Sequence, residues 1–167
     1  MNSKLLKHSV TTLLILVTVS FIIYAKTNGK IGTTKKNGEG CDCHGDANSK
    51  VTVMIDGPSE LKANQTAEYI LTITGGPLKK GGTNIAVSSG KLERGEGLVL
   101  KKGELTHSDP KNPVDGKVIF KFKYTAPETP GEITIFANGN STNNDDSKKG
   151  DAWNHAPNKI IKVSESI

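Results

Sequence analysis

Apolar and polar residues alternate with a period of two along much of this chain, and this pattern restricts its fold more than any other feature. The clearest run places four large apolar side chains at every second position, namely Val118, Phe120, Phe122 and Tyr124. Such alternation is typical of a β-strand that buries one face and exposes the other. Gly116 and Pro127 bound the run, as expected of turn residues at strand ends.

Shorter runs of the same kind occur elsewhere, separated by Gly, Pro, Asn and Asp. They lie at residues 51–55, 69–73, 84–88, 98–100, 104–106, 133–137 and 161–163. No stretch after Ala25 repeats apolar residues at helical spacing. Short alternating strands with turn residues between them predict an all-β domain, an antiparallel β-sandwich of the immunoglobulin-like type.

The first 25 residues differ from the rest and are typical of an export segment. Lys4 and Lys7 precede the uncharged, largely apolar run 10–25. This run is shorter than the ~20 apolar residues of a confident membrane span, and it ends at the small residue Ala25. We therefore predict that residues 1–25 are a signal peptide or an N-terminal membrane anchor. The rest of the chain is then periplasmic, secreted or associated with the cell envelope.

Three segments follow the export segment. Residues 26–39 are rich in Gly, Thr and Lys, and we expect them to form a flexible polar tether. Residues 40–49 hold a Cys/His cluster, and residues 50–167 form the β-sandwich domain.

The positive charge of the chain does not indicate a nucleic-acid-binding protein. The formal net charge is +5 at pH 7, from 22 Lys and Arg against 17 Asp and Glu. Lysine pairs such as Lys79-Lys80 lie at expected turns, and no aromatic residues interleave with a basic stripe. We expect a redox or surface partner and no nucleic acid, with membrane contact only through residues 1–25 if they are not cleaved.

Both cysteines lie in the hexapeptide 40–45, which reads Gly-Cys-Asp-Cys-His-Gly. A Cys-x-x-Cys-His run is the attachment motif of c-type haem, and here the spacing is shorter by one residue. Cys41 and Cys43 would form the two thioethers, and His44 would take one axial position on the iron. The second axial ligand would be His107, His155 or water. We favour His107, because a strand end holds an imidazole more rigidly than a loop does.

Two other interpretations of the motif stay open. Thiolates and imidazoles also bind Zn²⁺ or Cu⁺, so the same three residues are a candidate Zn or Cu site, which His107 or His155 would complete. Alternatively, the two cysteines form a small local disulfide in an oxidising compartment. In that case the chain is a cofactor-free surface adhesion or interaction module.

The sequence carries none of the common signatures of catalysis. It contains no Gly-x-Ser-x-Gly, no His-Glu-x-x-His and no glycine-rich phosphate loop, so we expect a protein that is not an enzyme. Acidic residues gather in the polar stretch 138–151 without EF-hand spacing, and we expect a solvated loop there rather than a Ca²⁺ site. We expect Trp153, which follows this stretch, to be a core residue.

Several short stretches of the body resemble the choice-of-anchor V domain, a bacterial surface and secreted β-sandwich module with a distant likeness to Reelin-type domains. They are the hexapeptide 40–45, Thr72-Ile73-Thr74-Gly75-Gly76-Pro77, Glu104-Leu105-Thr106-His107, Tyr124-Thr125-Ala126-Pro127, Ala137-Asn138-Gly139-Asn140 and Gly150-Asp151-Ala152-Trp153-Asn154. The resemblance implies an exported β-sandwich that begins with a Cys/His cluster, often Cys-x-x-Cys-His, which suggests haem attachment. The shorter Cys spacing is where this chain departs from the family pattern.

Overall fold

The computed structural model describes residues 29–38, 40–41, 47–145 and 147–166. Within these residues there are eleven β-strands and no helix. The strands are β1 (Val51–Asp56), β2 (Glu60–Lys62), β3 (Thr66–Gly75), β4 (Lys80–Val87), β5 (Lys91–Glu93), β6 (Leu98–Lys101), β7 (Glu104–His107), β8 (Lys117–Thr125), β9 (Gly131–Thr142), β10 (Ala152–His155) and β11 (Lys159–Ser164).

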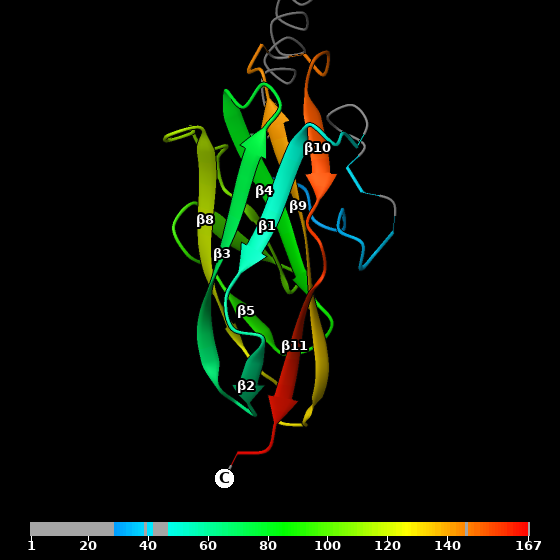
Figure 1. Ribbon diagram of the computed structural model, residues 1–167, viewed down its shortest axis with the longest axis vertical. Coiled ribbons are helices and arrows are strands. Elements are labelled where there is room, and N and C mark those ends of the chain that lie inside the picture. The colour runs from blue at the N-terminus through cyan, green and yellow to red at the C-terminus, as the bar shows by residue number, and fades with distance from the viewer. Residues whose placement is uncertain (1–28, 39, 42–46, 146, 167) are drawn as a thin grey trace, which may run out of the picture.

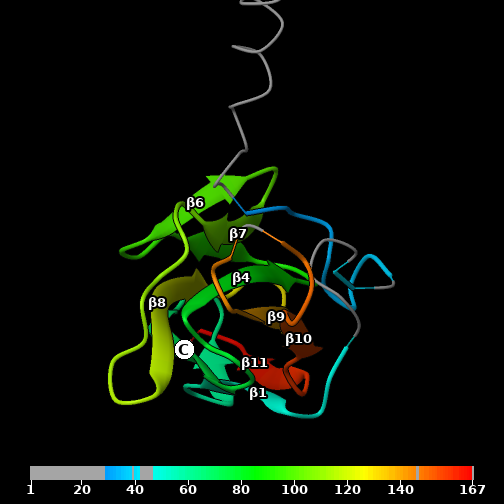
Figure 2. The same cartoon turned by 90° about the horizontal axis from the view of Figure 1, so that it is seen from above.

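The strands form two sheets that face each other (Figure 1, Figure 2). One sheet has four strands in the order β1-β3-β8-β5. The other has the order β2-β11-β9-β4-β7-β6, and β10 pairs with β9 beside this path. Paired strands are antiparallel, except that β11 and β2 run parallel. The all-β sandwich that the alternation predicts is therefore confirmed.

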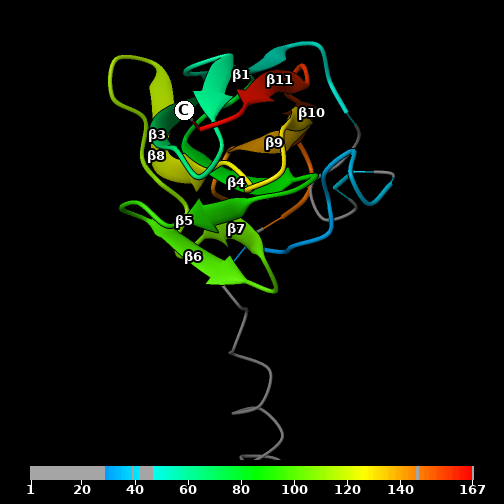
Figure 3. The ribbon, with the colours of Figure 1, turned by 90° about the horizontal axis from the view of Figure 1, so that it is seen from below.

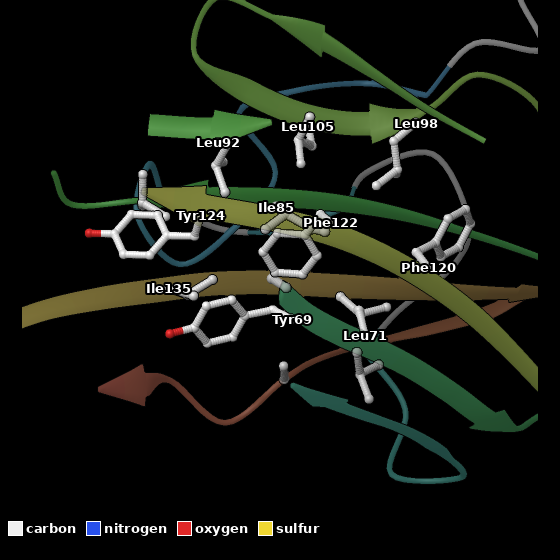
Figure 4. Packing of buried hydrophobic residues seen from close by; sticks show 14 of the residues in the cluster. Tyr69, Leu71, Ile85, Leu92, Leu98, Leu105, Phe120, Phe122, Tyr124 and Ile135 are labelled. Carbon is white, nitrogen blue, oxygen red and sulfur yellow. The ribbon is translucent and has the colours of Figure 1, made fainter. Parts of the chain in front are cut away.

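The core lies between the two sheets and follows the alternation in the sequence. On β8 the buried residues are Val118, Phe120, Phe122 and Tyr124, and the residues between them are exposed. Tyr69 of β3 stacks on Phe122, with the ring centroids 5.7 Å apart (Figure 4). The buried tyrosines keep their hydrogen bonds, because Tyr69 donates to the carbonyl of Pro58 and Tyr124 donates to that of Ser89.

Residues 29–38, named the strap from here on, pack against the outer face of the seven-stranded sheet, the face away from the core (Figure 3). Thr33 and Thr34 of the strap are only 3% and 0% exposed. This differs from the flexible tether predicted for residues 26–39, of which 26–28 and 39 lie outside the described residues. The reason is that β4 is buried on both faces, so its outward polar side chains need partners other than water.

Strand β9 occupies part of the stretch 138–151 that was expected to be a loop, and β10 follows directly after this stretch. β9 continues through Asn138 to Thr142, and both Trp153 and His155 lie on β10. The prediction of a solvated loop is therefore wrong for residues 138–142. Asn138, Asn140 and Ser141 are buried within the strand, although their types are those of turn residues.

Across the described residues, no helix is long and apolar enough to span a membrane. Residues 1–25 lie outside that part of the chain. The export segment, in either its cleaved or its anchored form, therefore stays a prediction.

Candidate functional site

Strands β10, β9 and β4 place a row of polar side chains on the outer face of the seven-stranded sheet. In the register of this sheet, His155 pairs with Asn138, which also pairs with Asn84. Directly paired residues project to the same side of a sheet. That side is the outer one, because a Cβ at the neighbouring Gly139 would project the other way and meet Ile73 in the core.

A second row lies beside the first and follows the same strands. Here Trp153 pairs with Asn140, which also pairs with Gly82. Residues 138 and 140 are two apart on one strand, so both rows face outward. We name this surface the polar platform, and its side chains are Asn84, Asn138, Asn140, Trp153 and His155.

The first cysteine of the motif rests on the polar platform. Asn138 Nδ2 donates a hydrogen bond to Cys41 Sγ at 3.3 Å. The Cys41 thiol in turn donates to Asn140 Oδ1, with the two atoms 3.4 Å apart. Asn138 is only 1% exposed. A buried amide has few alternative partners, so these contacts define where the cysteine motif meets the sheet.

The strap is joined to the same amides by a continuous set of hydrogen bonds. Asn138 Nδ2 donates to the carbonyl of Thr33 at 2.7 Å and to its Oγ1 at 2.9 Å. Thr33 in turn donates from its backbone N–H to Asn84 Oδ1 at 3.0 Å. The backbone N–H of Asn84 donates to Asn138 Oδ1 at 3.1 Å, which closes the set. The strap and the cysteine therefore share one buried support.

A buried carboxylate ends this network on the side of β7. Glu104 is 7% exposed and accepts hydrogen bonds from Asn84 Nδ2 at 2.9 Å, from the backbone N–H of Gly32 at 2.9 Å and from Asn37 Nδ2 at 2.6 Å. Bonds to a charged acceptor are stronger than bonds between neutral groups. Glu104 thus fixes the strap at two points just before the cysteine motif.

The chain that follows the cysteine motif also contacts the polar platform, at Trp153. Ala47 forms a parallel bridge with Trp153, and the backbone N–H of Asn48 donates to the Trp153 carbonyl at 2.8 Å. On the other side of the motif, a Cβ at Gly40 would collide with the Trp153 ring, and Gly40 has a φ of +99° that favours glycine. Both ends of the motif therefore lie against the Trp153 end of the polar platform.

Trp153 is buried, at 5% exposed. We expected Trp153 to lie in the core between the sheets. Its pairing with Asn140 instead places it on the outer face of the seven-stranded sheet, under residue 40. An indole there gives the motif an apolar surface to pack on.

His155 lies next to Trp153 on the polar platform. The two rings meet edge to face at 89°, with centroids 5.1 Å apart. Burial lowers the pKa of His155, the nearby positive charge of Lys35 lowers it further, and the carbonyl of Ala137 acts in the opposite direction. Burial and the Lys35 charge therefore both favour the neutral form of the imidazole. Its Nδ1 is buried and has no hydrogen-bond partner.

His107 lies on the other side of the platform, at the end of β7. The backbone N–H of Thr83 donates to His107 Nδ1 at 3.0 Å. The ring packs directly over Gly82, because a Cβ there would lie only 2.5 Å from the ring. Gly29 of the strap donates its N–H to the His107 carbonyl at 3.0 Å. This imidazole is part of the joint between β4, β7 and the strap.

The structure thus brings Cys41, His107 and His155 to one face of the seven-stranded sheet. Cys43 and His44 lie outside the described residues, so the predicted roles of both stay predictions. Among the described residues, no three His, Cys, Asp or Glu side chains are arranged to hold a metal ion. A Zn or Cu site would therefore have to draw on the motif itself.

The amides of the platform are the residues that sequence reasoning missed. Asn84 and Asn138 occupy outward-facing positions in their strands, where a polar residue ordinarily indicates exposure to solvent. One feature of the sequence could have indicated them: Asn138 and Asn140 are two positions apart at the end of an apolar run, so in a strand they share one face. Glu104, at the start of a short strand, gave no comparable signal.

The polar segment after β9 uses its acidic side chains to shape turns. Asp151 Oδ1 accepts the backbone N–H of Asn143 at 2.9 Å, and Asp145 Oδ1 accepts that of Ser147 at 3.0 Å. Hydrogen bonds from Ser147 lower the pKa of the Asp145 carboxyl. These contacts account for the acidic residues as parts of an exposed loop.

Neither a family model nor a curated protein matches this chain. Among solved structures, a CARDB domain from Pyrococcus furiosus is 20% identical, with a TM-score of 0.43, over 70% of this chain and 94% of that domain. A PKD domain of an M14-like peptidase from a Thermoplasmatales archaeon is 15% identical, with a TM-score of 0.38, over 67% and 92%. Alpha-2-macroglobulin of E. coli is 19% identical, with a TM-score of 0.42, over 71% of this chain and 7% of its own. Values this low leave the function to be inferred from the site itself.

Proposed function

We propose that this chain is an exported β-sandwich protein that carries a covalently attached c-type haem on its Cys-x-Cys-His motif. The haem would serve electron transfer or haem display at the cell envelope. The observation that carries the proposal is that Cys41 is held by the buried amides of Asn138 and Asn140 while the chain on both sides of the motif lies against Trp153. The resemblance to the choice-of-anchor V domain supports the same assignment.

The residues of the platform fit such a group chemically. Cys41 and Cys43 would supply the thioether sulfurs and His44 one iron ligand. A thioether sulfur keeps its lone pairs, so it can still accept the hydrogen bond that Asn138 donates to Cys41, whereas the one that the Cys41 thiol donates to Asn140 would be given up on attachment. The Trp153 ring offers an apolar surface beside the motif.

A fixed support matters more here than in the usual motif. With a single residue between the two cysteines, the linking peptide is short, and the attached group has little freedom to find its position. The platform holds the first sulfur and the flanking chain in place before attachment, which lowers the conformational entropy lost on binding. The bound group supplies one-electron redox chemistry, and this chain supplies its position.

A second candidate is a cofactor-free surface interaction module with a local disulfide between Cys41 and Cys43. One observation on the other sheet favours it. Met54 and Ile119 flank Thr72 on the outer face of the four-stranded sheet, where they are 52% and 43% exposed. Exposed apolar side chains side by side on a sheet suit contact with another surface.

The two candidates differ in their absorbance and mass. The full chain is expressed in a bacterial host that has the cytochrome c maturation system, and the purified protein is examined by a pyridine haemochrome assay. We expect a haem spectrum that survives acid and organic extraction, and its loss in the Cys41→Ser, Cys43→Ser double variant. A colourless protein two hydrogens lighter than its reduced form would overturn the haem proposal in favour of the disulfide. Stoichiometric zinc or copper would favour the metal site instead.

A further inference from the structure

We propose that Asn37, near the end of the strap, is a site of spontaneous deamidation, and that this modification loosens the strap from the sheet. The reacting group is a side-chain amide of the chain itself, and the co-reactant is water. Asn37 lies ahead of the cysteine motif, so the reaction is independent of any group that the motif carries.

Deamidation at an Asn-Gly pair is a reaction of the backbone with the side chain. The glycine nitrogen loses its proton to solvent and attacks Cγ of the asparagine, so that a new C–N bond closes a five-membered imide. The side-chain nitrogen takes up a proton and leaves as ammonia. Water then opens the imide at one of its two carbonyl carbons, which gives aspartate or isoaspartate. Glycine favours the ring closure because it has no Cβ to hinder the approach.

The chain contains three Asn-Gly pairs, and the fold protects two of them. In one pair, the Gly29 N–H donates to the His107 carbonyl at 3.0 Å. In another, Gly139 lies inside β9, which is paired with β4 and with β10. A backbone nitrogen held in a hydrogen bond or a ladder is less able to lose its proton and to turn toward a side chain. Both pairs should therefore react slowly in the folded protein.

The third pair, Asn37-Gly38, lies in an exposed turn at the end of the strap. Among the described residues, none accepts a hydrogen bond from the Gly38 N–H. The space beside Gly38 is open, since a Cβ there would meet no atom within 4 Å. The glycine nitrogen is therefore free to approach the Asn37 side chain, and water can reach the imide.

The amide that the reaction removes fastens the strap to a buried carboxylate. Asn37 Nδ2 donates to Glu104 Oε1 at 2.6 Å, and Glu104 is only 7% exposed. A carboxylate at position 37 has no N–H to donate, and it places a second negative charge beside Glu104. Gly32 keeps its own hydrogen bond to the other oxygen of Glu104. The end of the strap next to the cysteine motif is therefore the part that is released.

The test follows the modification and the strap together, in the full chain kept folded at mildly alkaline pH. A protease that cleaves after glutamate gives a first peptide that ends at Glu39 and contains neither cysteine. Mass spectrometry with fragmentation then locates the mass gain of OH over NH₂. We expect Asn37 to react first. Hydrogen exchange of the strap amides should become at least about tenfold faster as it does, because a hydrogen bond to a charged acceptor is lost.

Asn37→Gln is the matched control, because glutamine keeps an NH₂ donor for Glu104 but would have to close a larger ring. It should show neither the mass gain nor the faster exchange. Asn37→Asp should show the faster exchange from the start. The proposal is overturned if Asn37 stays unmodified in the folded protein, or if Asn138 reacts as fast as Asn37. Exchange in Asn37→Asp as slow as in the wild-type protein would also overturn it, because the strap would then not depend on this amide.

Discussion

The outer faces of the two sheets both carry polar side chains, yet those on one sheet are solvated and those beneath the strap on the other are buried. On β8 of the four-stranded sheet, Lys117, Lys121 and Lys123 alternate with core residues and are exposed. On β4 and β9 of the seven-stranded sheet, Asn84 and Asn138 are each 1% exposed beneath the strap. A lysine only donates, whereas an asparagine amide both donates and accepts and can pair with backbone. Asparagines on the outward positions of a strand therefore mark a face that another segment covers.

The largest effect should come from the core that both sheets share. Phe120 is fully buried on β8, and Phe120→Ala should lower the free energy of unfolding by about 3–5 kcal/mol through the cavity it leaves. Lys123→Ala, on the opposite face of the same strand, should change it by less than about 0.5 kcal/mol. Urea denaturation followed by circular dichroism measures both. Similar losses for the two variants would mean that this outer face is also covered.

An intermediate effect should come from the covered face. Asn84→Ala removes the acceptor of the Thr33 N–H and one donor to Glu104. Leaving such buried groups without partners should lower the free energy of unfolding by about 1–3 kcal/mol. The same urea denaturation applies, again with Lys123→Ala as the control. A loss as small as that of the lysine variant would show that water reaches this face and that the strap does not cover it.

A smaller, more specific effect should be seen between the strap and the sheet. Thr33 Oγ1 donates to Asn84 Oδ1 at 3.0 Å. In a double-mutant cycle, Thr33→Val and Asn84→Ala should therefore show a coupling energy of at least about 0.5 kcal/mol. Thr33→Val combined with Lys123→Ala should be additive within about 0.3–0.5 kcal/mol. If the effects of Thr33→Val and Asn84→Ala are additive, the hydrogen bond between the strap and the polar platform does not contribute to stability.

The smallest effect at neutral pH concerns the buried tyrosines. Burial raises the pKa of Tyr69 and of Tyr124 to about 12, and for Tyr69 the charge of Tyr124 contributes as well. An acid whose pKa is raised by folding contributes stability below its ordinary pKa of about 10, and this stability is lost as the pH rises toward 12. Ultraviolet absorbance should show tyrosinate forming with a midpoint near pH 12, or together with alkaline unfolding. A midpoint near pH 10 in the folded protein would contradict the buried placement.

The solvated face could be predicted from the sequence, whereas the face covered by the strap could not. The run on β8 was found because its lysines and aromatics alternate cleanly, and its strand, core face and solvated face all follow from that. The strap and the polar end of β9 were not found, since Thr33 and Asn138 have the residue types of tethers and turns. Their burial depends on two segments about a hundred residues apart in the chain that satisfy each other's hydrogen bonds. No local pattern carries that information.

The candidate site divides in the same way. Its chemistry-bearing residues were evident from type and spacing, because two cysteines and a histidine lie together at 41–44. The residues that position them were not evident, and Asn138 and Glu104 are the clearest cases. The use that the fold makes of His107 was not evident either, since only the structure shows that the backbone N–H of Thr83 donates to its Nδ1.

The most direct test of the account is the mass of one peptide. Trypsin cleaves after Lys36 and Lys50, and no Lys or Arg lies between them, so residues 37–50 with both cysteines form a single peptide. For protein matured in a host that attaches c-type haem, we predict that this peptide carries the mass of one haem in thioether linkage to Cys41 or to both cysteines. A peptide that is unmodified, or two hydrogens lighter through a disulfide, would contradict the account.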